Sequence, residues 1–60
     1  MTIIEVELPD DLAMALAQFL KRVGYSDYLS LAIDKQEACE MVDAGETVRK
    51  ALADKGFAPR

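Results

Sequence analysis

The sequence predicts one small α+β domain, mainly helical, in which an N-terminal β-strand precedes two main α-helices with a short helical turn between them. Three observations lead to this β-α-α prediction. The first residues alternate between apolar and charged, two later segments repeat apolar residues at helical spacing, and helix-capping residues flank both segments. A chain of 60 residues has room for one domain, so the whole of 1–60 is taken as a single unit.

The strand is expected over residues 2–8, where alternation gives it two different faces. One face would carry Ile4, Val6 and Leu8, and the other Ile3, Glu5 and Glu7. A lone strand exposes a row of unpaired backbone groups, so we expect it to pair with its symmetry mate. The prediction is therefore a homodimer with Ile4, Val6 and Leu8 at the interface.

The first main helix is expected over residues 10–23. Pro9 suits the start of a helix, and Asp10 and Asp11 suit its first turn, because the helix dipole is positive there. Gly24 would end the helix in a left-handed conformation. Large apolar residues recur on one face and form its expected buried side: Leu12, Leu16, Phe19, Leu20 and Val23.

The segment that follows is ambiguous, and Ser26 could cap a short helical turn over 26–32. The spacing of Asp34 and Glu37 is that of a capping box and predicts a second main helix over 35–55. Gly56 would end this helix and leave a short tail over 56–60. Its expected apolar side is Ala38, Met41, Gly45, Val48 and Leu52, with Val42 alongside.

Gly45 is unusual in the middle of this apolar side. A helical glycine costs about 1 kcal/mol relative to alanine, so we expect another backbone or a bulky ring to pack closely against it. Phe19 and Tyr28 are the candidate rings.

The composition argues against several classes of function. The chain has no histidine, one cysteine and three scattered glycines, so it lacks the residues of a nucleophilic relay, a zinc site or a phosphate-binding loop. We expect no enzyme, no metal and no cofactor, and Cys39 is expected to be a small buried packing residue. No segment approaches the roughly 20 apolar residues of a membrane span, and no basic signal region follows Met1. A cytoplasmic protein without membrane contact is the expectation.

The net charge of −4 makes direct nucleic-acid binding unfavourable, because phosphate backbones repel an acidic chain. Four acids would fan across the solvent side of the second main helix: Glu37, Glu40, Asp43 and Glu46. Glu5 and Glu7 could extend this set. Two interpretations stay open, an ordinary solvated face and a docking face for a basic protein partner.

A short alternating strand, the run Leu-Pro-Asp-Asp and an amphipathic helix ending at a glycine resemble the opening of ribbon-helix-helix regulators over residues 2–26. The resemblance implies a dimer whose strands pair antiparallel, with Ile4, Val6 and Leu8 in the core and Ile3, Glu5 and Glu7 facing the DNA major groove. Two carboxylates facing DNA would be repelled. We therefore carry over the dimer, and keep a DNA-binding regulator as the alternative function.

The remaining segments look like small accessory proteins of phages and plasmids, from Gln18–Tyr25 through Glu37-Ala38 and Ala51–Ala53 to Gly56–Arg60. That resemblance implies a mobile-element setting, in which small acidic proteins occupy the nucleic-acid-binding surface of a host defence or processing complex as DNA mimics. The predicted function is a non-catalytic, acidic interaction module, an inhibitor or adaptor that docks on a basic partner.

Overall fold

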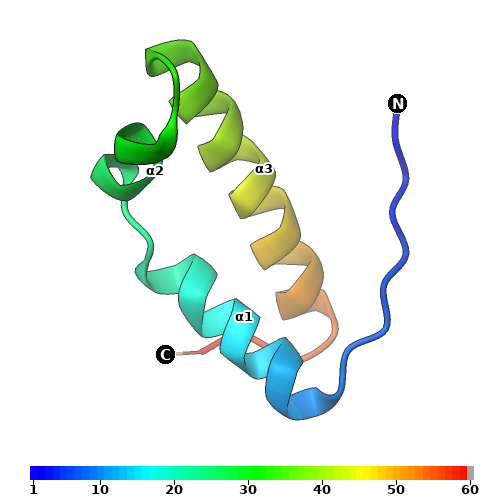
Figure 1. The fold of residues 1–60 in the computed structure, drawn as a ribbon. Helices are drawn as coiled ribbons and strands as arrows, with labels where there is room; N and C mark the ends of the chain where they lie inside the picture. The colour runs from blue at the N-terminus through cyan, green and yellow to red at the C-terminus, as the bar shows by residue number, and fades with distance from the viewer. Residues whose placement is uncertain (60) are drawn as a thin grey trace.

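A computed structural model describes residues 1–59 as three α-helices preceded by an irregular N-terminal arm, residues 1–9 (Figure 1). The helices are α1 over Asp10–Arg22, α2 over Tyr25–Leu31 and α3 over Lys35–Asp54. Both α1 and α2 pack against α3. In Figure 1, α2 lies beside the beginning of α3, and the start of α1 lies near the end of α3.

The predicted β-strand over 2–8 is not found in the described part of the chain, so the α+β prediction of a strand-paired β-α-α fold is wrong: these residues form an all-helical fold. No backbone hydrogen bond joins 2–8 to the other described segments. Alternating residues favour an extended chain, but a strand also needs a neighbouring strand to complete its hydrogen-bond ladder. Residues 10–59 are mostly helical and supply no such neighbour.

The junction between α1 and α2 differs in detail from the prediction. Helix α1 ends one residue before the predicted bound, and Gly24 has a φ of −104° instead of a left-handed conformation. Helix α2 begins at Tyr25, and the Gly24 N–H donates to Asp27 Oδ2 at 2.9 Å. The side chain that caps α2 is therefore that of Asp27 and not that of Ser26, because a carboxylate in the first turn can reach back to an N–H left without a helical partner.

Both ends of α3 are closed by hydrogen bonds. At its start, Asp34 Oδ1 accepts from the Glu37 N–H at 2.8 Å, while Glu37 Oε1 accepts from the Ile33 N–H at 3.1 Å. The predicted capping box thus closes one residue further back, on Ile33 instead of Asp34. At its end, Gly56 has a φ of 99°, and the N–H groups of Gly56 and Phe57 donate to Ala53 and Leu52. This pattern is a Schellman motif, in which glycine tolerates the left-handed conformation.

The buried core consists of alanine. Ala13 and Ala17 of α1 and Ala38 of α3 are buried, and no larger side chain of the described residues is buried with them. The large apolar residues predicted for the buried side of α1 are instead half-buried or exposed, with Leu12 52% and Phe19 59% exposed. Small side chains allow two helices to approach closely, so the alanine face of α1 lies inside and the face with large side chains is left beside it.

The predicted close approach at Gly45 is confirmed, with Tyr28 as the ring. A Cβ added at Gly45 would overlap the Tyr28 hydroxyl and lie 3.2 Å from Tyr28 Cζ and 3.6 Å from Leu20 Cδ2. Helix α2 therefore places an aromatic ring directly on the bare backbone of α3. A larger residue at position 45 would push the two helices apart.

Candidate interaction surfaces

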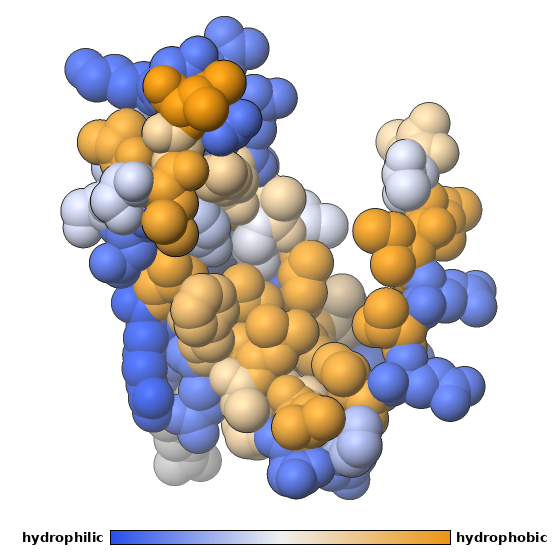
Figure 2. All heavy atoms as spheres, in the orientation of Figure 1, coloured by the Kyte–Doolittle hydropathy of each residue, from blue (hydrophilic) through white to orange (hydrophobic). Residues whose placement is uncertain are grey.

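An open cleft of about 1090 Å³ separates the arm from the helices. Its arm side carries Ile4, Val6 and Leu8, and its helical side carries Leu16 of α1 with Val48 and Leu52 of α3. Figure 2 shows apolar side chains gathered on the arm and on the helical surface beside it. The helices form one wall of the cleft and the arm forms the other, and both walls are predominantly apolar.

The three residues predicted for a dimer interface all lie on the arm wall. Ile4 is 78% exposed and Val6 72% exposed, and no segment of residues 1–59 covers them. The sequence analysis placed Leu16 on the expected buried side of the first main helix, and Val48 and Leu52 on the expected apolar side of the second. All three line the cleft in the structure.

A second, shallower groove of about 870 Å³ lies between α1 and α2. Phe19, Tyr28 and Leu31 supply its apolar lining, and Arg22 and Asp27 are among its polar residues. The Arg22 guanidinium donates to the side chain of Gln18, one helical turn earlier. This groove is separate from the cleft beside the arm.

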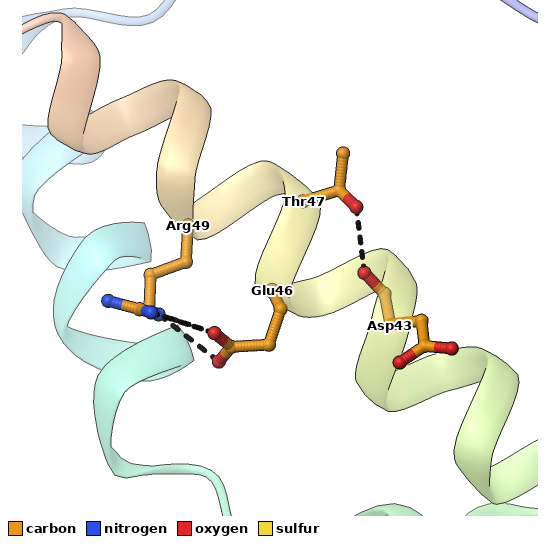
Figure 3. A network of polar contacts seen from close by, with 4 residues as sticks. All are labelled: Asp43, Glu46, Thr47 and Arg49. Carbon is orange, nitrogen blue, oxygen red and sulfur yellow. Dashed lines mark hydrogen bonds and ion pairs between the residues drawn. The ribbon is translucent and has the colours of Figure 1, made fainter.

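The four acids predicted on the second main helix all lie on α3, but two of them are already engaged. Glu37 accepts from the Ile33 N–H. Glu46 Oε2 lies 2.7 Å from Arg49 Nη2, and this ion pair joins two residues one helical turn apart (Figure 3). Glu40 and Asp43 are exposed and form no ion pair within residues 1–59. The uncompensated charge of this face is therefore concentrated at Glu40 and Asp43.

The contact with Arg49 alters both titrating groups. The hydrogen bond from the Arg49 guanidinium lowers the pKa of the Glu46 carboxyl below its ordinary value, and the same bond raises the pKa of Arg49. Both groups are therefore charged at neutral pH and largely neutralise each other.

Glu5 and Glu7 lie on the arm and line the cleft, so the structure places them apart from the acidic residues on the outside of α3. Asp43 precedes Leu52 by nine residues, and at roughly 100° per residue these two positions point in opposite directions. The apolar wall and the acidic face are thus two different sides of the same helix.

Other chemical features of the described residues are sparse. No group of three or more potential metal-ligating side chains is found in residues 1–59. No helix within that range has the length and apolar character to cross a bilayer. Cys39 is exposed and does not pack in the interior as predicted, because it lies outside the face of α3 that contacts the other helices.

Comparison with known proteins places the whole chain in one family and gives no activity. Neither a curated protein nor a solved structure matches it. The resemblance to ribbon-helix-helix regulators and to phage and plasmid proteins therefore stays a prediction. The profile of a family of unknown function, DUF7706, matches residues 1–60, and the chain belongs to that family.

Proposed function

We propose that this chain is a non-catalytic interaction module that acts as a homodimer and presents the outer face of α3 to a basic protein. The observation that carries the proposal is the pair of exposed carboxylates at Glu40 and Asp43, which no base within residues 1–59 neutralises. The net charge of −4 adds a long-range attraction for a positively charged surface.

The position of this acidic face supports the proposal. Because it points away from the apolar cleft, it stays in contact with water when the cleft is covered. Exposed charges of this kind contribute little to folding but increase the rate and specificity of association with an oppositely charged surface.

In its finer form, the proposal is an inhibitor or adaptor encoded by a phage or plasmid. The complementary surface would be the basic groove with which a host complex binds nucleic acid. An acidic face seated in that groove would exclude the nucleic acid by competition, without any chemical step.

Two matched charge variants test the acidic face. In the first, Glu40→Gln is combined with Asp43→Asn; in the control, Asp10→Asn is combined with Asp11→Asn at the start of α1. Both remove two negative charges. A host protein is first captured with the unmodified chain. This protein is then titrated with the unmodified chain and the two variants, at low and at high salt. We expect about tenfold weaker binding for the α3 variant at low salt, a smaller difference at high salt and little change for the control.

Two results would overturn the proposal. The first is equal affinity of the α3 variant and the unmodified chain at both salt concentrations. The second is micromolar binding of labelled duplex DNA with a steep salt dependence, which is the behaviour of the alternative, a DNA-binding regulator.

A further inference from the structure

We propose that the cleft beside the arm is occupied by a second copy of this chain, which enters with its own arm. Ile4, Val6 and Leu8 of each copy would then cover Leu16, Val48 and Leu52 of the other. The inference rests on the proposed homodimer and assigns the surface through which its two copies meet. It does not depend on the acidic face of α3.

The amount of exposed surface is the first argument. The chain exposes 5106 Å². A folded monomer of its mass, 6.6 kDa, is expected to expose about 3,900 Å². The excess of about 1,200 Å² per chain is about 2,400 Å² for two chains, which falls within the range of about 2,000–5,000 Å² that obligate homodimer interfaces bury. An interface of that size, centred on the cleft, would bring each chain to the surface area of a normally folded protein.

The weakness of the internal core is the second argument. Three buried alanines are a small core for a domain of 60 residues, and such domains commonly depend on oligomerisation. Both walls of the cleft expose branched apolar side chains that a single chain does not bury. A second copy supplies both missing parts, because each copy brings one arm and one helical wall.

Symmetry and charge favour a second copy over an unrelated protein. In a two-fold arrangement, one exchange of arms covers both clefts and leaves none open. The arm carries Glu5 and Glu7, and the helical wall ends at Lys55. None of these three forms an ion pair within residues 1–59. An incoming arm would therefore bring acids to a wall whose end is basic.

The first experiment uses the unmodified chain. Sedimentation equilibrium gives the mass in solution, and a mixture of isotope-labelled and unlabelled chains gives isotope-filtered NOE contacts between copies. We expect a dimer with contacts from the methyl groups of Ile4 and Val6 to Val48 or Leu52 of the other copy. A folded monomer at micromolar concentration would overturn the homodimer itself. A dimer whose contacts between copies avoid the cleft would overturn only the assigned surface.

The second experiment compares two substitutions of the same kind. Val6→Asp places a charge on the arm wall, and Ile33→Asp places one at a position that is 85% exposed and outside the cleft. We expect Val6→Asp to raise the dimer dissociation constant at least tenfold and Ile33→Asp to change it less than twofold. Equal effects of the two substitutions, or no effect of Val6→Asp, would contradict the assignment. Because folding is coupled to association in this account, the helical signal of Val6→Asp should fall on dilution together with the dimer, and that of Ile33→Asp should fall only where the unmodified chain also dissociates.

Discussion

Gly45 is the residue on which the packing of α2 against α3 depends. Its missing side chain leaves room for the Tyr28 hydroxyl and ring, which lie closer to the α3 backbone than a Cβ would permit. Glycine in a helix costs about 1 kcal/mol relative to alanine. Position 45 nevertheless carries glycine, because a larger residue would overlap the Tyr28 hydroxyl.

Gly45→Ala should therefore destabilise the protein although alanine is the better helix former. Overpacking of this kind costs about 1–3 kcal/mol, which exceeds the gain in propensity. In a Tyr28→Phe background, which removes the hydroxyl, most of the loss should disappear. Urea unfolding of the four forms gives the coupling between the two sites.

Gly24→Ala is the matched control for that series. A Cβ there would meet only Asp27 Oδ2 at 3.7 Å, an ordinary contact, and the φ of Gly24 is negative. Its free energy of unfolding should stay near that of the unmodified protein. Equal losses for Gly45→Ala in the two Tyr28 backgrounds would show that overlap with the Tyr28 hydroxyl is not the cause.

The Glu46–Arg49 pair gives a prediction for pH. The pKa of Glu46 is lowered in the folded state by its hydrogen bond with Arg49. The pair therefore stabilises the protein above the ordinary pKa of glutamate, and this contribution is lost as pH falls through the lowered value. Because both side chains are exposed, the effect is small.

Comparison with Glu46→Gln measures this contribution directly. The urea midpoints of the two proteins should differ slightly at neutral pH and converge in acid. A difference that persists unchanged at pH values below the titration of Glu46 would contradict the assigned role of the ion pair.

At the scale of elements, helix ends were easier to predict than helix faces. Asp34 with Glu37, and Gly56, act through local hydrogen bonds and backbone conformation, so their neighbours in sequence were sufficient to place α3 within one residue. The buried face of α1 depends instead on its partner helix. Hydropathy favoured large residues such as Leu12 and Phe19, whereas close approach to α3 selected alanines.

The arm and the acidic face were also predicted only in part. Alternation in residues 2–8 indicated an extended segment, but a strand requires a neighbour that the sequence of one chain cannot reveal. For the acidic face, helical spacing placed four acids on α3. The predicted capping box already engaged Glu37, but nothing in the spacing indicated that Arg49 neutralises Glu46.

The cap of α3 gives a prediction at this scale. Asp34→Ala removes the acceptor for the Glu37 N–H, and loss of such a cap costs about 1 kcal/mol. Ser26→Ala is the comparison, because Ser26 is exposed and its side chain does not cap α2. Thermal unfolding should show a lower midpoint for Asp34→Ala only; similar midpoints for both variants would argue against the cap.

At the scale of the whole molecule, the structure has two chemically different surfaces. One side, the cleft formed by the arm with α1 and α3, is predominantly apolar and open in the single chain. The opposite side of α3 carries the acids proposed to meet a basic protein. A second copy in the cleft would complete the core and leave the acidic side free for that protein.

The central claim is that one copy of the chain is an incomplete folding unit, and the concentration dependence of thermal unfolding tests it most directly. If two copies complete each other, unfolding includes dissociation, and the midpoint must rise with protein concentration. For a dimer of this size we expect a rise of about 10 °C over a hundredfold increase in concentration. A cooperative transition with the same midpoint across that range would contradict the claim.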